Sequence, residues 1–179
     1  MRKMMLVLAA LAVGVILGGC STKTAYIETP GSEYVDPAAQ FNVGDITDSS
    51  GFQFAPDDED AFNLADAMRE SLQSELSKYV AQNTSKQYSI NIDILKYAPG
   101  NAFARWLMPG AGATKLSVNA AIIDDEGGAA ANIPVERSIA AGGGFTIGAW
   151  KYVFDEVAAE IVKIITDISK RKPPKEASK

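Results

Sequence analysis

The sequence predicts an α+β fold with two layers, in which a mostly antiparallel sheet of four strands packs against two amphipathic helices. Three observations support this fold class. Four segments alternate apolar and polar residues, as strands with one buried face do. Two longer segments repeat apolar residues every three or four positions, as helices do. The elements follow the order strand, helix, three strands, helix, which is typical of a two-layer α+β domain.

The first strand is predicted over residues 41–46, with Phe41, Val43 and Asp45 on one face. Ile46 breaks this alternation, which indicates either a strand buried on both faces or a β-bulge. The first helix is predicted over residues 61–81, after an acidic run at 57–60 that suits the positive end of a helix. Its apolar stripe consists of Ala61, Ala65, Met68, Leu72, Leu76 and Tyr79.

Three further strands and a second helix are predicted in the rest of the chain. Alternation is clearest from Tyr88 to Ile94, and it recurs from Leu116 to Ile122 and from Ile133 to Ile139. The acidic glycine-containing segment 124–128 joins the last two strands as an antiparallel hairpin. Arg137 falls on the apolar side of its strand, which suggests a place at a sheet edge. The last helix is predicted over residues 149–168, with Asp155, Glu156, Glu160 and Lys163 facing outward.

The start of the chain, residues 1–19, is a predicted signal peptide. Arg2 and Lys3 precede an uncharged apolar run from Met4 to Ile16. This run is shorter than the roughly 20 apolar residues that a membrane-spanning helix needs, so cleavage is favoured over an uncleaved anchor. It is followed by Leu17-Gly18-Gly19-Cys20, which resembles the lipobox of bacterial lipoproteins. That resemblance implies cleavage before Cys20 and acylation of its thiol and new amine.

The lipobox defines where the mature chain is expected to reside. Several acyl chains on Cys20 give stable membrane attachment, which one chain alone does not. Ser21 after the cysteine favours the outer membrane over the inner membrane, by analogy with known sorting preferences. We therefore expect a lipid-anchored protein of the outer membrane that faces the periplasm. The predicted division is a signal peptide over 1–19, lipidated cysteine and tether over 20–39, one domain over 40–169, and a basic disordered tail over 170–179.

Composition argues against several classes of function. The chain has no histidine, which is the commonest acid–base catalyst and metal ligand at neutral pH, and Cys20 is its only cysteine. Residues 21–169 carry 10 basic and 21 acidic groups, a balance that repels nucleic acid. Segment 57–60 lacks the ligand spacing of a calcium loop. We therefore predict no catalytic residues, no metal, no cofactor and no nucleic-acid partner.

Two unusually apolar loops are the candidate functional segments. Loop 98–114 either caps the core or exposes an apolar patch that meets a partner or a bilayer. Loop 140–148 is glycine-rich, but Ile147 stands where a dinucleotide-binding loop requires its third glycine, so no nucleotide is expected. The residues predicted to contact a partner are Phe103, Trp106, Leu107, Met108, Phe145 and Ile147.

A family resemblance rests on several of these segments together. Residues 105–113, the strand after them, the acidic glycine turn and the glycine-rich approach to the last helix resemble bacterial lipoproteins with domain of unknown function 4410. The resemblance covers roughly residues 41–168. It implies an α+β envelope domain and assigns no catalytic residue.

The function predicted from these observations is non-enzymatic. The protein is expected to be held to the membrane through Cys20 and to bind an envelope protein or another envelope component through the two apolar loops. One alternative is a carrier that holds a small apolar ligand between its sheet and helices. Another is a carboxylate-dependent hydrolase using acids such as Asp45, Asp48 and the run 124–126.

Overall fold

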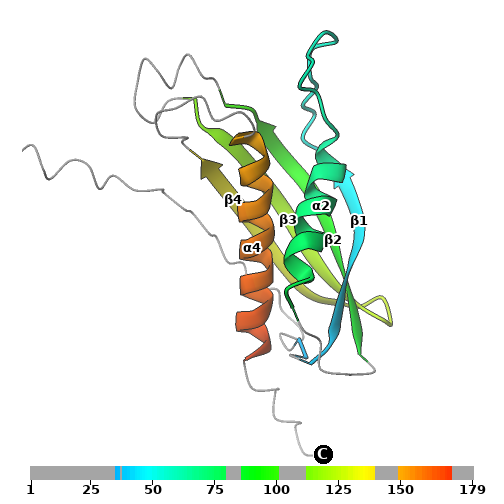
Figure 1. The fold of residues 1–179 in the computed structure, drawn as a ribbon. Coiled ribbons are helices and arrows are strands. Elements are labelled where there is room, and N and C mark those ends of the chain that lie inside the picture. The colour runs from blue at the N-terminus through cyan, green and yellow to red at the C-terminus, as the bar shows by residue number, and fades with distance from the viewer. Residues whose placement is uncertain (1–34, 37, 80–85, 101–111, 140–148, 171–179) are drawn as a thin grey trace, which may run out of the picture.

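The computed structural model describes residues 35–36, 38–79, 86–100, 112–139 and 149–170. Its elements follow the predicted order and confirm the α+β fold class. Both helices lie against the same face of the sheet, so the domain has two layers (Figure 1). The elements are β1 (Gln40–Asp48), α2 (Leu64–Leu76), β2 (Gln87–Ala98), β3 (Thr114–Asp124), β4 (Ala129–Ile139) and α4 (Ala149–Ser169).

The sheet has the strand order β1-β2-β3-β4. Strand β1 pairs in parallel with β2, because α2 carries the chain back between them. The pairs β2–β3 and β3–β4 are antiparallel, and the predicted hairpin over β3 and β4 is confirmed. The sheet therefore has β1 and β4 as its edge strands among the described residues.

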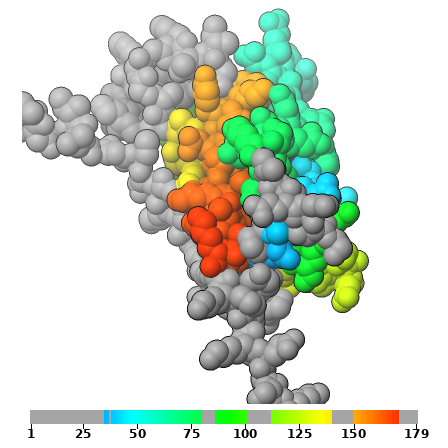
Figure 2. All heavy atoms as spheres, turned by 60° about the horizontal axis from the view of Figure 1, so that its bottom comes forward, coloured from blue at the N-terminus to red at the C-terminus, as the bar shows by residue number. Residues whose placement is uncertain are grey.

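The domain has two distinct ends. We call the end formed by the last residues of β1, β2 and β4, the start of β3 and the first turns of both helices the loop pole. The opposite end, the tether pole, holds the start of β1, the β3–β4 turn and the end of α4. Figure 2 shows the end of α4 beside the first residues of β1. Nowhere in the described part of the chain does a helix reach the length and hydropathy needed to cross a membrane.

The core lies between the helices and the sheet. Alternate residues of β2 and β3 are buried there against the apolar stripes of both helices, as the sequence periodicity predicts. Val35 and Ala39 are fully buried in this same cluster, so the packed domain includes the residues just before β1. The largest fully buried side chains include Phe154, Met68, Leu72, Ile90, Ile94, Leu116 and Ile161.

Strand β1 contains the β-bulge that Ile46 indicated. The register with β2 shifts between Val43 and Ile46. Asn91 Oδ1 accepts a hydrogen bond of 3.0 Å from the backbone N–H of Asp45. Arg69 Nη1 on α2 donates a hydrogen bond of 3.2 Å to the Gly44 carbonyl. A Cβ atom at Gly44 would overlap the Asn91 side chain, so this close approach requires glycine.

Helix α2 is shorter than predicted at both ends. It begins at Leu64 rather than at residue 61, because Asn63 Oδ1 accepts a 3.0 Å hydrogen bond from the Asp66 N–H and caps the helix. It ends at Leu76. The acidic run 57–60 therefore lies in turns ahead of the helix, not at its first turn.

The prediction that Glu160 faces solvent is wrong. Glu160 Oε2 on α4 lies 2.5 Å from Arg137 Nη2 on β4, and the two side chains are 12% and 10% exposed. Arg137 is therefore tolerated on the apolar side of β4 because a carboxylate from the covering helix neutralises it. Its predicted place on an edge strand is confirmed.

Candidate functional site

The side chains singled out from the sequence lie outside the described residues. These are the lipidation residue Cys20 and the predicted contact residues Phe103, Trp106, Leu107, Met108, Phe145 and Ile147. The structure does describe both ends of loop 98–114 and the residues Ile139 and Ala149 that flank loop 140–148. The site is therefore built from the residues that flank and underlie those segments.

Both predicted loops begin and end at the loop pole. Ala98, which ends β2, is the register partner of Lys115, and Thr114, which begins β3, is the partner of Ile139 at the end of β4. Thr114 Oγ1 also accepts a 3.1 Å hydrogen bond from the Gly100 N–H at the start of the first loop. The register thus brings the ends of the two loops together, although the whole β3–β4 hairpin separates Thr114 from Ile139 along the chain.

An aromatic cluster underlies the loop pole. Phe62 stacks on Trp150 with ring centroids 3.9 Å apart, and this contact joins the segment before α2 to the first turn of α4. Offset and edge-to-face ring contacts of this kind stabilise beyond the area they bury. The other members of the cluster are Phe52, Phe54, Tyr97 and Phe154. The sequence analysis did not predict this cluster. The alternation of Phe52 and Phe54 shortly after β1 is the pattern that could have indicated it.

Tyr97 carries the polar group of this cluster. Its side chain is 5% exposed, and its hydroxyl has no hydrogen-bond partner within the part of the chain that the structure describes. Burial raises the pKa of Tyr97 to about 12, because the apolar surroundings disfavour the phenolate. A buried hydroxyl without a partner costs about 1–3 kcal/mol of stability.

We expect Tyr97→Phe to stabilise the protein by about 1 kcal/mol at pH 7, because it removes this unpaired hydroxyl and leaves the ring contacts in place. The pKa of Tyr97 is higher in the folded state, so the wild type loses stability as pH rises from 10 toward 12. Tyr97→Phe has no phenol group to ionise, so its stability should not fall in this pH range for that reason. Urea unfolding at pH 7 and pH 11 measures both effects; a wild type more stable than the variant at either pH contradicts the prediction.

The outer part of the loop pole carries both apolar and acidic side chains. Tyr152 on α4 is 57% exposed, and Trp150 and Phe62 are partly exposed. The neighbouring segment before α2 contains the fully acidic run Asp57–Asp60, whose four residues are all exposed. Two backbone turns order this run, with bonds from Asp58 N to Ala55 O and from Ala61 N to Asp58 O, both 3.1 Å. The segment projects beyond the sheet (Figure 1).

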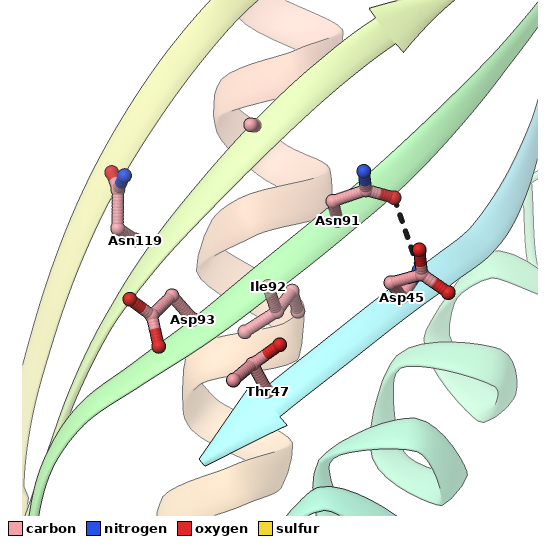
Figure 3. A pocket seen from close by; sticks show the side chains of 7 residues that line it. Asp45, Thr47, Asn91, Ile92, Asp93 and Asn119 are labelled. Carbon is pink, nitrogen blue, oxygen red and sulfur yellow. Dashed lines mark hydrogen bonds between the residues drawn. The ribbon is translucent and has the colours of Figure 1, made fainter. Parts of the chain in front are cut away.

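A shallow polar depression lies on the sheet face that the helices leave uncovered (Figure 3). Its volume of about 270 Å³ is smaller than the roughly 300–1,000 Å³ typical of pockets that enclose small ligands. Asp93 Oδ1 is buried there without a described hydrogen-bond partner. The lining residues are Asp45, Thr47, Asn91, Ile92, Asp93, Asn119 and Ala121.

The acids considered for a hydrolase do not come together in the structure. Asp48 Oδ1 accepts a 2.9 Å hydrogen bond from Ser50 N–H and thereby orders the turn after β1. Asp124 Oδ1 accepts bonds from the N–H groups of Glu126 and Gly128, so it orders the β3–β4 turn at the opposite end of the sheet. Asp45 lies between them in the bulge of β1. This arrangement supplies no facing carboxylate pair from these candidates.

The four-stranded sheet with both helices on one face defines a two-layer α+β domain, and sequence comparison places it in a family. The model of the domain of unknown function DUF4410 matches residues 40–143, and the chain belongs to this family. The match agrees with the resemblance found in the sequence. No curated protein sequence matches the chain.

Two solved structures share the fold at low sequence identity, and a third is similar over a smaller part of the fold. A PelC dodecamer variant from Paraburkholderia phytofirmans has 10% identity and a TM-score of 0.52, with 80% of this chain and 98% of that chain covered. A second PelC dodecamer structure from the same organism has 12% identity and a TM-score of 0.51, covering 84% and 99%. A minor lipoprotein from Acinetobacter baumannii has 15% identity and a TM-score of 0.39, covering 72% and 91%.

Proposed function

We propose that this protein is a lipid-anchored, non-enzymatic protein of the outer membrane that binds other protein chains through its loop pole. The observation that carries the proposal is the convergence of several apolar elements at one end of the domain. The flanks of both apolar loops meet there, next to Tyr97 of the aromatic cluster, and the exposed Tyr152 belongs to the first turn of α4 at the same pole. The predicted side chains of the two loops would add to Tyr152 there, and a contiguous exposed apolar surface is typical of a contact site.

The position of the predicted lipid indicates that the loop pole contacts a protein chain and not the bilayer in which the lipid is anchored. The chain enters the domain at Val35, at the tether pole, a short segment after Cys20. The 21 residues of α4 span about 31 Å from the loop pole to the tether pole. A lipid on Cys20 thus holds the tether pole toward the membrane and the loop pole away from it.

The alternatives receive less support from the described residues. A carrier would need space between the sheet and the helices, but the side chains of this layer, such as Ile90, Leu116 and Ile161, are fully buried. The candidate acids of a hydrolase are spread along the sheet. The PelC structures, which share the fold, are dodecamers, so this fold is compatible with assembly from several copies.

Site-specific photocrosslinking in the native envelope tests the proposal. A benzophenone side chain at Tyr152, which is 57% exposed, is expected to give adducts with protein chains. The same group at Asp125 is the control, because Asp125 is exposed but lies in the β3–β4 turn at the tether pole. Phe103→Ser with Trp106→Ser should reduce the Tyr152 adducts without unfolding the domain. Equal adducts from both positions, or lipid adducts alone from Tyr152, would overturn the proposal.

A further inference from the structure

A row of polar side chains crosses the uncovered face of the sheet at Asp93. The strand registers place Thr47 of β1, Asp93 of β2 and Asn119 of β3 side by side in this row. Their side chains extend from the face opposite α4 (Figure 3). Neighbours on one face of a sheet lie about 5 Å apart, so these oxygen-bearing groups form a flat strip and not a closed shell.

Asp93 carries the acceptor of this row that lacks a donor. Its Oδ1 atom is buried without a hydrogen-bond partner in the described part of the chain, and none of the ion pairs found there includes Asp93. A carboxylate oxygen held away from water without a donor is unfavourable, so a ligand that donates to Asp93 gains affinity from correcting this. Rotation about χ2, a soft torsion in aspartate, can turn Oδ1 toward the depression.

The flat arrangement of the acceptors favours a guanidinium group over a metal ion. Calcium takes about six to eight oxygen ligands around one centre. The depression contains two carboxylates, Asp45 and Asp93, which belong to different strands and different rows of the sheet. Within the described ranges no group of three or more acids, cysteines or histidines could hold a metal ion. A guanidinium is planar and donates its hydrogens in a fixed fork, so it can bridge neighbouring acceptors on a flat face.

The shape of the depression favours a guanidinium from a protein chain over a free small molecule. Its volume of about 270 Å³ is too small to enclose most ligands, and it adjoins short side chains such as Ala121 and Asn132 on the same face. A protein chain can contact this face as well as the depression. A second copy offers no free guanidinium among its described residues, because Arg69 and Arg137 both donate within their own domain.

We propose that the uncovered face of the sheet binds a different protein chain, which places an arginine guanidinium in the depression against Asp93. Asp45, which also lines the depression, adds a second negative charge to the site. This surface is separate from the loop pole, so the inference goes beyond the proposed function and does not depend on it. Pairing of charges at this open surface makes the contact weaker at high salt.

NMR titration of the purified, full-length lipidated protein in detergent tests the chemistry of the site. The probes are N-acetyl-arginine amide and N-acetyl-citrulline amide, which has nearly the same shape but no charge. The side-chain amide signals of Asn91 and Asn119 report binding, because both residues line the depression. We expect the arginine probe to shift these signals saturably and the citrulline probe to bind about tenfold more weakly, since it lacks charge-assisted hydrogen bonds. Equal shifts from both probes, or a saturable shift from calcium chloride, would exclude a guanidinium site.

Two pairs of variants test the role of Asp93. Asp93→Asn should weaken binding of the arginine probe about tenfold, whereas Asp125→Asn, which removes an exposed acid at the tether pole, should leave it unchanged. Ala121→Arg places a guanidinium diagonally across from Asp93 and should block the probe, whereas Ala121→Gln should lower its affinity far less. The Ala121 pair decides the test if Asp93→Asn lowers the melting temperature. Unchanged binding by folded Asp93→Asn contradicts the proposal.

Photocrosslinking in the native envelope tests the source of the guanidinium. A benzophenone side chain at Ser89, which is exposed on the same face two residues from Asn91, should give adducts with a different protein. These adducts should map close to an arginine of that protein and should be lost when Asp93→Asn is also present. Adducts with a second copy or with lipid alone, or adducts that persist with Asp93→Asn, would overturn the proposal. Protein adducts from Tyr152 would survive that outcome, so the proposed function is tested separately.

Discussion

Replacing Arg137 by methionine is expected to lower the free energy of unfolding by about 3–5 kcal/mol, because Glu160 then loses its principal charge partner in a largely buried place. Lys163 Nζ, 3.7 Å from Glu160 and on a 67% exposed side chain, compensates only weakly. Urea unfolding at pH 7 measures the loss. The double variant Arg137→Met/Glu160→Met should recover most of it, since a well-packed apolar pair can replace a buried ion pair.

An exposed ion pair supplies the control for this prediction. Lys151 and Glu70 join α4 to α2 at 2.9 Å, but their side chains are 48% and 69% exposed. Lys151→Met should therefore change the free energy of unfolding by less than about 1 kcal/mol. A cost for Arg137→Met no larger than that of Lys151→Met would show that burial does not control the strength of the Arg137–Glu160 pair.

Replacing Phe154 by alanine is expected to cost about 3–5 kcal/mol, because it leaves a cavity where the helix meets the aromatic cluster. Phe154 is fully buried, with its ring centroid 5.9 Å from Phe62 and 5.8 Å from Tyr97. Tyr152→Ala, two residues away on the same helix, should cost less than about 0.5 kcal/mol because that side chain is 57% exposed. Thermal unfolding of the two variants under the same conditions compares them, and similar losses would contradict the packing described for α4.

Hydrophobic periodicity was sufficient to predict the fold. The elements bury one face each, so the spacing of apolar residues shows which residues share the core, as in Tyr88, Ile90, Ile92 and Ile94 of β2. The irregularity in β1 was visible, because Ile46 is out of phase with Val43, but the structure was needed to show that it is a bulge and not a strand buried on both faces. The start of α2 could not be predicted from the apolar pattern. That pattern begins at Ala61, but the Asn63 side chain caps the helix, which therefore begins at Leu64.

Contacts between segments that are distant in the chain could not be predicted from the sequence pattern. Glu160 appeared to face solvent because helical periodicity places it outside the apolar stripe, and only the position of β4 beside α4 gives it Arg137 as a partner. The aromatic cluster likewise joins Phe52, Tyr97 and Trp150 from three parts of the chain. The predicted contacts in loops 98–114 and 140–148 remain predictions, although the structure brings the flanks of these loops together.

The parallel pairing of β1 with β2 determines how the domain would carry mechanical load. If the proposed lipid on Cys20 and a partner at the loop pole pulled on the domain, tension would enter through the buried residues Val35 and Ala39 just ahead of β1 and be held at the opposite end of the sheet. The force then acts along the strands, and the β1–β2 hydrogen bonds, which run between the strands, are loaded in shear. These bonds share the force instead of breaking one after another, so the domain should resist unfolding under this tension better than one pulled from the side of its edge strand.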